Sequence, residues 1–357
     1  MSSVSSEGYF VRLLREQSTA CWINSAIQRE IEAARGWGAI GNTMNPTHPP
    51  KALKADFHLW GPVMEEILES NRGVTDDVAA ELLTQRMAKR SSLVFLSMYE
   101  DTERQYGYVT IQSDPNTNHD PVALVRQAIS YKHIGPNVVP KVPSTDPGRH
   151  ALEELVAQGT NVIATAGFSV SQAIAMAEAY AAGLKRFSGS GPNPRCYVVI
   201  IPGVFDDYLH EVIKRDGINI DPNLVRYAGI AWCRRVYRIF QERGYQAEIQ
   251  VGGTRENYHI TDLVGGNVHI THSFSTWDRL QKESLPAISR IGEQAPEQVI
   301  LELQEKLVDF RRAYAIDGLM PDEFSSFGPY VKFQTGCQKG LAETRSQIRA
   351  MRQQRAL

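Results

Sequence analysis

Short apolar runs rich in β-branched residues alternate along the chain with longer stretches whose apolar positions recur at helical spacing. Apolar runs bounded by Gly, Pro, Asn or Asp are typical of buried strands, and apolar residues three and four apart are typical of helices that cover a core. This pattern predicts strands at residues 19–24, 37–43, 106–112, 137–143, 161–168, 196–203, 247–254 and 267–275. Because helices separate the strands, we expect a parallel sheet.

The stretches between the strands contain good helix formers on one apolar face, and the clearest are residues 25–35, 147–158, 170–184 and 223–243. Eight strand-helix units predict an α/β fold, a closed (β/α)8 TIM barrel in a single domain. Two helical stretches, at 52–71 and 76–89, are predicted to form an insertion on the barrel. We therefore expect residues 1–283 to form the barrel and residues 284–357 to form a helical C-terminal extension packed on it.

The composition is that of an ordinary globular protein, with 42% hydrophobic and 22% charged residues in a chain of 357. A net charge of -2 gives no general attraction to nucleic acid or to an anionic membrane, so neither is expected as a partner. The N-terminus lacks an apolar signal-type core and no apolar run reaches the length of a membrane span, so we expect a cytoplasmic protein. The oligomeric state stays open, a homo-oligomer included.

The cysteines and histidines give no sign of a metal site. The four cysteines are widely scattered without a CxxC pair, and the nine histidines include no HExxH motif. Neither a disulfide framework nor a zinc site is indicated, and no nucleotide or flavin motif is present. We expect no cofactor.

Lys141 is the most informative residue, because it lies inside the almost wholly apolar segment 137–143, NVVPKVP. Desolvation disfavours a charged amine and lowers its pKa, and a neutral amine can attack a carbonyl group. This reading predicts a covalent imine with a small-molecule carbonyl substrate. The alternative is a lysine that reaches the strand end and pairs with a carboxylate.

The predicted barrel favours the first reading, because active sites of such barrels lie at the carboxyl ends of the strands. Polar residues are predicted at several of these ends beside Lys141, namely Asn24, Asn45, Gln112, Thr165, Arg255 and His272. An amine surrounded by polar strand ends is the arrangement that Schiff-base chemistry needs, and core packing alone does not require it.

Three segments resemble motifs of the transaldolase family. Residues 41–47 read GNTMNPT, residues 139–148 read VPKVPSTDPG, and residues 155–173 read LVAQGTNVIATAGFSVSQA. They are similar to the T-S/T-N-P turn, the Schiff-base segment and the fifth-strand motif of that family, and weaker similarity extends from about residue 19 to 267. The resemblance implies a barrel whose lysine forms an imine with a ketose and cleaves a carbon-carbon bond.

Carried over residue by residue, the resemblance gives three matches. Lys141 corresponds to the imine-forming lysine, Thr165 to the threonine that holds a water, and Asn45 to the asparagine that hydrogen-bonds the substrate. Arg255 roughly matches a basic residue after the seventh strand.

The other positions depart from the family. Asn24 stands where the family has an aspartate that moves a proton, and Gln112 stands where it has a glutamate. Ile163 replaces a substrate-binding asparagine, and Val204 takes the place of the phosphate-binding arginine. Amides keep the hydrogen-bonding reach of the acids but exchange no proton near pH 7, which typically costs about 10² to 10⁴ in rate. Valine cannot bind a phosphate as an arginine fork does.

Several residues are candidates for the missing proton transfer. His272 ends the eighth predicted strand and could shuttle protons at the mouth, or it could be a histidine held by neighbouring backbone. Asp114, two residues beyond Gln112, could point into the mouth or cap a turn. Asp206 and Asp207 open a predicted helix, where the favourable charge at a helix start is explanation enough.

The predicted site thus has Lys141, Thr165, Asn24 and Gln112 as catalytic residues and no metal. Its predicted substrate-binding residues are Asn45, Ile163, Val204, Arg255 and His272. Three functions remain in view: a Schiff-base enzyme acting on a carbonyl compound other than a usual sugar phosphate, a genuine transaldolase that uses Arg255 for phosphate, and a non-catalytic barrel used for binding.

Overall fold

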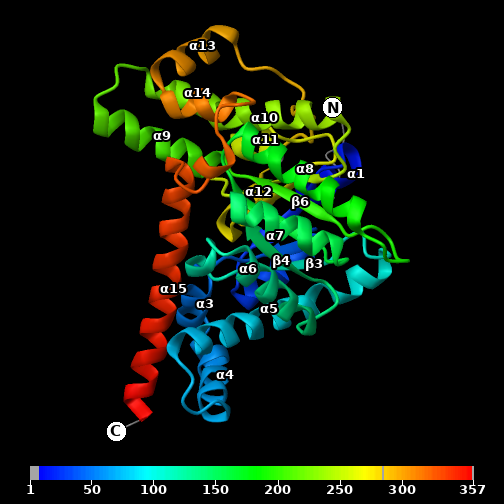
Figure 1. Ribbon diagram of the computed structural model, residues 1–357, viewed down its shortest axis with the longest axis vertical. Coiled ribbons are helices and arrows are strands. Elements are labelled where there is room, and N and C mark those ends of the chain that lie inside the picture. Colours follow the sequence, from blue (N-terminus) through cyan, green and yellow to red (C-terminus); the bar gives the residue numbers. More distant parts are fainter. Residues whose placement is uncertain (1–7, 284, 356–357) are drawn as a thin grey trace.

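Eight parallel strands close into a barrel in the computed structural model, which describes residues 8–283 and 285–355 (Figure 1). The strands are β1 (Ala20–Asn24), β2 (Gly41–Thr43), β3 (Tyr108–Gln112), β4 (Val138–Pro143), β5 (Val162–Gly167), β6 (Cys196–Ile200), β7 (Glu248–Val251) and β8 (His269–His272). Each strand pairs with the next in sequence, and β8 closes the ring on β1 with Ala20 opposite His269. The predicted (β/α)8 barrel is confirmed.

Helices cover the outside of the barrel, where their apolar faces pack on the strands. They are α1 (Tyr9–Gln17), α2 (Gln28–Gly36), α6 (Pro121–Ser130), α7 (Asp146–Ala157), α8 (Val170–Arg186), α9 (Pro202–Asp216), α10 (Arg226–Arg243), α11 (Tyr258–Thr261) and α12 (Phe274–Lys282). Side-chain caps begin several of them: Thr145 accepts the Gly148 N–H before α7, and Ser169 accepts the Gln172 N–H before α8.

Several strands are shorter than predicted, for local reasons. The predicted strand 37–43 begins only at Gly41, because α2 runs to Gly36 and Gly38 turns the chain with a φ of +107°. The predicted strand 196–203 ends at Ile200, since Pro202 opens α9 at a position that a helix start tolerates.

The insertion between β2 and β3 is helical, as predicted, and consists of α3 (Pro49–Ala55), α4 (Phe57–Ser70) and α5 (Asp76–Asp101). The predicted end of its last helix at residue 89 is wrong, because α5 continues to Asp101. Its apolar face continues through Phe95 and Tyr99, and it packs on β3. The insertion thereby borders the carboxyl end of the barrel.

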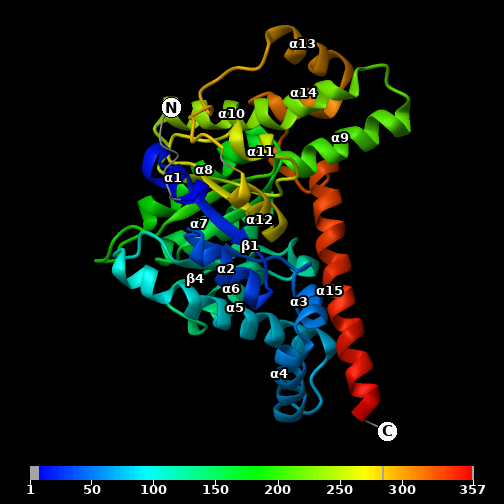
Figure 2. The ribbon, with the colours of Figure 1, turned by 180° about the vertical axis from the view of Figure 1, so that it is seen from behind.

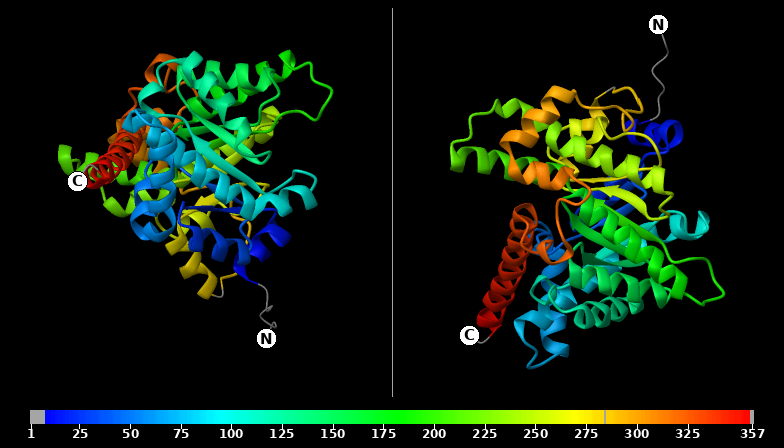
Figure 3. Two further views of the ribbon diagram at one scale, coloured as in Figure 1. Left: turned by 90° about the horizontal axis from the view of Figure 1, so that it is seen from below. Right: turned by 45° about the horizontal axis from the view of Figure 1, so that its top comes forward.

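The chain beyond the barrel forms three helices, α13 (Glu297–Lys306), α14 (Val308–Tyr314) and α15 (Gly328–Arg355). The first two pack on α10, where the Arg235 guanidinium lies 4.4 Å from the centre of the Tyr314 ring. The long α15 runs along α5, α3 and α9, on the opposite side of the barrel from α1 (Figures 2 and 3). Residues 1–7, 284 and 356–357 of the two predicted segments lie outside the described residues.

A buried polar network fills the amino end of the barrel. The Trp22 indole donates to His269 Nδ1 at 2.9 Å, and the other ring nitrogen of His269 lies 3.0 Å from Glu248 Oε2. Arg195 donates to both Glu248 oxygens and covers the Tyr197 ring. This end is closed by packing, so the carboxyl end is left for a ligand. No helix in the described part of the chain is long and apolar enough to span a bilayer.

Candidate active site at the carboxyl end of the barrel

Lys141 lies in the middle of β4 with only 7% of its surface exposed. Its Nζ donates to the backbone oxygen of Met44 at 3.3 Å, and no ion pair to a carboxylate is found for it within the described residues. Burial lowers the pKa of the Lys141 amine from 10.5 to about 8, and the nearby Cys337 thiol opposes this effect. The structure therefore contradicts the alternative in which this lysine is held by an acidic partner.

A cavity of about 530 Å³ opens in front of Lys141 at the carboxyl ends of the strands. This is the size range of small-molecule sites in proteins. Six of the nine predicted site residues line it: Lys141, Thr165, Asn24, Asn45, Val204 and Arg255. These residues come from β1, β4 and β5 and from the loops or helices that follow β2, β6 and β7. The predicted clustering of strand ends therefore brings most of the predicted residues into one cavity.

Hydroxyl and amide groups form one part of the polar wall of this cavity; the rest comes from the titratable or charged side chains Glu30, His48, Lys51, Lys141, Arg255 and Lys332. Asn24 Oδ1 accepts a hydrogen bond from the Thr43 hydroxyl at 3.1 Å, and that hydroxyl lies 2.6 Å from the Thr271 hydroxyl. Asn45 Oδ1 accepts from the backbone N–H and the hydroxyl of Thr47, which fixes the turn after β2. An amide side chain can donate and accept hydrogen bonds but exchanges no proton near neutral pH.

Gln112 is adjacent to Lys141 in the strand register but does not line the same cavity. Its Nε2 donates to Cys337 Sγ at 3.7 Å, and the side chain faces a second cavity beside the first. Gln112 therefore does not line the Lys141 cavity, whose wall includes Cys337, and its catalytic role stays a prediction.

Ile163 is in register with Lys141 but is fully buried in the core and does not line the cavity. The predicted substrate contact of Ile163 is corrected on this ground, because a side chain with no accessible surface offers a ligand nothing to touch.

The His272 ring is buried and does not line the Lys141 cavity. Its ring packs between Phe10 and Trp277, with ring centres 5.2 and 4.8 Å away, and neither ring nitrogen has a hydrogen-bond partner. Burial lowers the pKa of His272 to about 3, so the ring is neutral near pH 7. The proposed proton shuttle at His272 is wrong, because successive residues of β8 face opposite sides and Thr271 is the one that faces the cavity.

Arg255 lines the cavity but is already engaged. Its Nε donates to Asp207 Oδ2 at 2.8 Å. The loop that carries it is held by His259, whose Nδ1 accepts the backbone N–H groups of Arg255 and Glu256 and whose Nε2 lies 2.9 Å from Asp206. Burial raises the pKa of Asp206, while its bond to His259 acts in the opposite direction. Asp206 and Asp207 are thus structural partners of this loop.

Sequence reasoning missed the part of the wall that comes from α3 and α15. His48 and Lys51 line the cavity from the start of α3, and Lys332, Phe333, Gly336 and Cys337 line it from α15. His48 accepts the Asn45 N–H at Nδ1, and burial, with Lys51 and Lys141 nearby, lowers the pKa of His48 to about 3. Its position directly after the NPT turn was a usable signal. Nothing local in the sequence of α15 shows that it reaches the barrel mouth.

The fold and this cavity define a parallel (β/α)8 barrel protein with a buried lysine in a ligand-sized site at the carboxyl ends of its strands. Residues 21–320 match the model of the Transaldolase/Fructose-6-phosphate aldolase family, and the chain belongs to that family. The matched region contains all eight strands of the barrel except Ala20, the first residue of β1.

Curated relatives carry transaldolase names at low identity. Transaldolase 1 of Streptomyces coelicolor is 30% identical over 188 residues, covering 50% of this chain and 48% of the relative. The transaldolase of Saccharopolyspora erythraea is 27% identical over 241 residues, 64% of each chain, and Transaldolase 1 of Streptomyces avermitilis is 27% identical over 255 residues, covering 68% and 66%. The chain therefore aligns with about half to two thirds of the length of these relatives.

Among solved structures, a putative phosphonomutase from Burkholderia cenocepacia J2315 aligns with 76% of this chain and 93% of its own. The sequence identity is 11% and the TM-score is 0.38. This likeness carries no functional argument.

Proposed function

We propose that the protein is a transaldolase-like enzyme in which Lys141 forms a Schiff base with a carbonyl substrate other than a usual sugar phosphate. The observation that supports this most directly is the burial of Lys141 without a carboxylate partner in front of a cavity of about 530 Å³. An amine with a pKa of about 8 has a neutral fraction of about 9% at pH 7, against about 0.03% at a pKa of 10.5.

In the proposed reaction the neutral Lys141 amine attacks the substrate carbonyl, and a new Nζ–C bond forms while the carbonyl oxygen takes up a proton. That oxygen takes up a second proton from solvent and leaves as water, and the protonated imine remains. The imine accepts the electron pair of the bond between the α and β carbons of the substrate as that bond breaks, while the hydroxyl group on the β carbon gives its proton to a water in the cavity and becomes the carbonyl of the aldehyde product. The resulting enamine is available for an acceptor aldehyde.

The lining residues have defined parts in this proposal. The Thr165 hydroxyl holds the water that enters or leaves at the imine carbon, and Asn24 and Asn45 orient the substrate hydroxyl groups through hydrogen bonds. The neutral His48 ring, whose Nδ1 already accepts a backbone N–H, carries its proton on Nε2 and is a hydrogen-bond donor to a substrate oxygen.

Two features support a substrate without the usual phosphate. Val204 gives an apolar wall at a phosphate-binding position of the family. Two of the cations at the cavity are already neutralised, because Arg255 pairs with Asp207 and Lys332 pairs with Glu211. The alternative of a genuine transaldolase is favoured by Lys51, a further cation in the lining. A coupled assay with fructose 6-phosphate and erythrose 4-phosphate separates the two.

The central test is borohydride trapping with a panel of ketones and aldehydes, followed by mass analysis of peptides. We expect a reduced adduct on Lys141 and none on the exposed Lys185, with Lys141→Met as the matched control. Absence of an adduct from every carbonyl compound, in a folded protein, would instead favour the non-catalytic barrel.

A further inference from the structure

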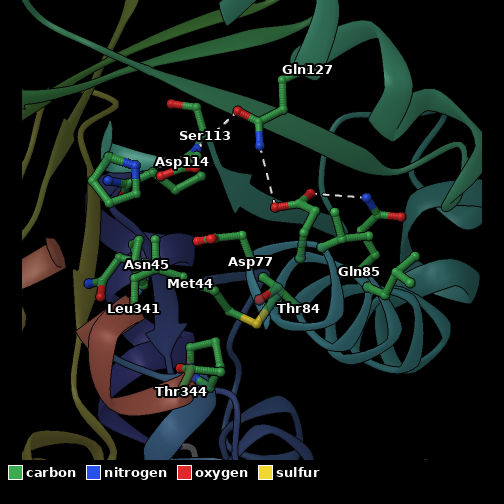
Figure 4. A pocket seen from close by; sticks show the side chains of 17 residues that line it. Met44, Asn45, Asp77, Thr84, Gln85, Ser113, Asp114, Gln127, Leu341 and Thr344 are labelled. Atoms are coloured by element: carbon green, nitrogen blue, oxygen red, sulfur yellow. Dashed lines mark hydrogen bonds between the residues drawn. The ribbon is translucent and has the colours of Figure 1, made fainter. Parts of the chain in front are cut away.

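A second cavity, of about 370 Å³, lies beside the Lys141 cavity (Figure 4). Its walls come from the turn after β2, from α5, from the loop after β3 and from α15. Asn45 lines both cavities, and Gln112 lines the second while bonding to Cys337 on the wall of the first. The two cavities are therefore neighbours that share one lining residue, Asn45.

Much of the second cavity is apolar, which suits the aliphatic body of a ligand. The apolar lining residues come from four separate segments and are Met44, Pro46, Pro49, Val78, Leu82, Pro115 and Leu341. A ligand in this space gains free energy from burial of its hydrocarbon surface.

The polar part of the lining is rich in acceptors. Asp77, Glu81 and Asp114 are its carboxyl groups, whereas no lysine or arginine of the described chain lines it. Asp77 is paired from outside the lining with Arg345 at 3.0 Å, and Asp114 Oδ1 accepts the Asn116 N–H at 2.8 Å.

Within the described residues, the hydrogen-bond donors found for Glu81 are neutral side chains. Its oxygens accept from Gln85 Nε2 at 2.9 Å and from Gln127 Nε2 at 3.3 Å, bonds that Figure 4 shows on one side of the cavity. Burial raises the pKa of the Glu81 carboxyl, and its hydrogen bonds oppose that rise only in part. A cation in the cavity would supply the compensation that the protein itself does not give.

Gln112 is an independent sign of a missing donor. It is 8% exposed, it lines this cavity, and its Oε1 has no hydrogen-bond partner. A buried acceptor without a partner destabilises the protein, and a ligand N–H would satisfy it. This residue belongs to the barrel and not to the acidic helix, so it points to a donor ligand without reference to the carboxyl groups.

We propose that this cavity binds the ammonium group of an organic amine with an aliphatic or alicyclic body. Glu81 and the Gln112 oxygen accept its N–H groups, and the apolar lining contacts its hydrocarbon part. Because Asn45 lines both cavities, we assign the amine to the remote part of the carbonyl compound that reacts at Lys141, and this assignment rests on the proposed function. The proposal that the cavity binds an amine does not depend on the proposed function.

A matched pair of probes tests the site: cyclohexylamine, which is cationic at pH 7, and the uncharged cyclohexanol of similar shape. Affinities are measured by ligand-observed NMR titration on the full chain. A charge-assisted hydrogen bond is worth about 1.5–3 kcal/mol, so we expect cyclohexylamine to bind about ten-fold or more tightly than cyclohexanol. The Lys141→Ala variant should show the same preference.

Two variants locate the binding. Glu81→Gln keeps the size of the side chain and should remove the preference for the amine. Thr84→Lys places an ammonium group in the cavity from the same helix and should abolish amine binding by repulsion. Melting curves show whether each variant is folded. Because the two substitutions are different, the test can still be made with one variant if the other unfolds.

Equal binding of the two probes, or a preference that survives both variants, would overturn the proposal. Amine binding that persists in Lys141→Ala, together with failure of borohydride trapping in the parent chain, would leave the amine site standing and refute the Schiff-base function instead. The two inferences thus fail on different measurements.

Discussion

Replacement of Lys141 by methionine should stabilise the fold while it abolishes imine formation. A lysine whose pKa falls from 10.5 to about 8 on folding destabilises the folded state at neutral pH, because its charged form is desolvated. Each ten-fold change in proton affinity is worth about 1.4 kcal/mol, so the cost at pH 7 is about 3 kcal/mol. Loss of the bond to the Met44 oxygen subtracts about 1 kcal/mol. We expect a net gain of about 2 kcal/mol.

The pH dependence separates this cause from ordinary packing effects. Between pH 8 and 10.5 the unfolded chain holds a proton on this lysine that the folded chain has released, so wild-type stability rises with pH in this window. The advantage of Lys141→Met should therefore shrink by about 2 kcal/mol between pH 7 and 9.5. Urea unfolding at the two pH values measures it, and the exposed Lys185→Met is the matched control.

Two results would refute the reasoning. One is a Lys141→Met variant that is less stable than the parent at pH 7. The other is a stability difference that stays constant between pH 7 and 9.5. Either would mean that the amine remains protonated and solvated in the folded state, and the covalent role proposed for it would lose its physical basis.

Substitutions at four further positions test the site. His272→Phe should leave imine trapping unchanged. It should also reduce the loss of folding stability between pH 7 and 5 by about 2 kcal/mol, because between pH 6.5 and about 3 His272 is protonated in the unfolded chain but not in the folded one. Urea unfolding at the two pH values measures this difference. Gly336→Ala should stabilise α15 by about 0.5–1 kcal/mol without loss of imine trapping, because a Cβ at this position meets nothing within 4 Å. Gly336→Trp should instead fill the Lys141 cavity and prevent formation of the reduced adduct. Asn24→Asp should raise the rate of retro-aldol cleavage by up to about 10², and Gln112→Glu should change this rate little, because of the two residues only Asn24 lines the Lys141 cavity. A kcat that responds more to Gln112→Glu than to Asn24→Asp would contradict the geometry.

The barrel could be predicted from the sequence because its strands are buried on both faces and read as continuous apolar runs. The ends of those runs could not be placed, since apolar residues also open the next helix. The predicted strand 196–203 includes Pro202 and Gly203, which already belong to α9. Lys141 could be identified from the sequence for the same reason as its strand, because a charged residue inside a continuous apolar run is conspicuous.

The direction in which a side chain points was harder to predict than the strand to which its residue belongs. The β8 sequence His269–His272 has histidines at both ends, and strand alternation requires that they face opposite sides. Only the packing of Trp22 against His269 decides which of them is inside the barrel, and that contact joins residues 247 positions apart. The sequence pattern alone left His272 as plausible as Thr271 for the mouth of the cavity.

The helix α15 shows why the residues that line a barrel site cannot all be found from the strands of the barrel. Gly336 and Cys337 line the Lys141 cavity, while Leu341 and Thr344, one and two turns further along, line the second cavity. A single helix from outside the barrel therefore closes both sites, and its placement depends on contacts with α5, α3 and α9. If the amine site and the lysine site serve one substrate, a displacement of α15 would change both affinities together, and the Gly336→Trp and Thr84→Lys variants would separate their contributions.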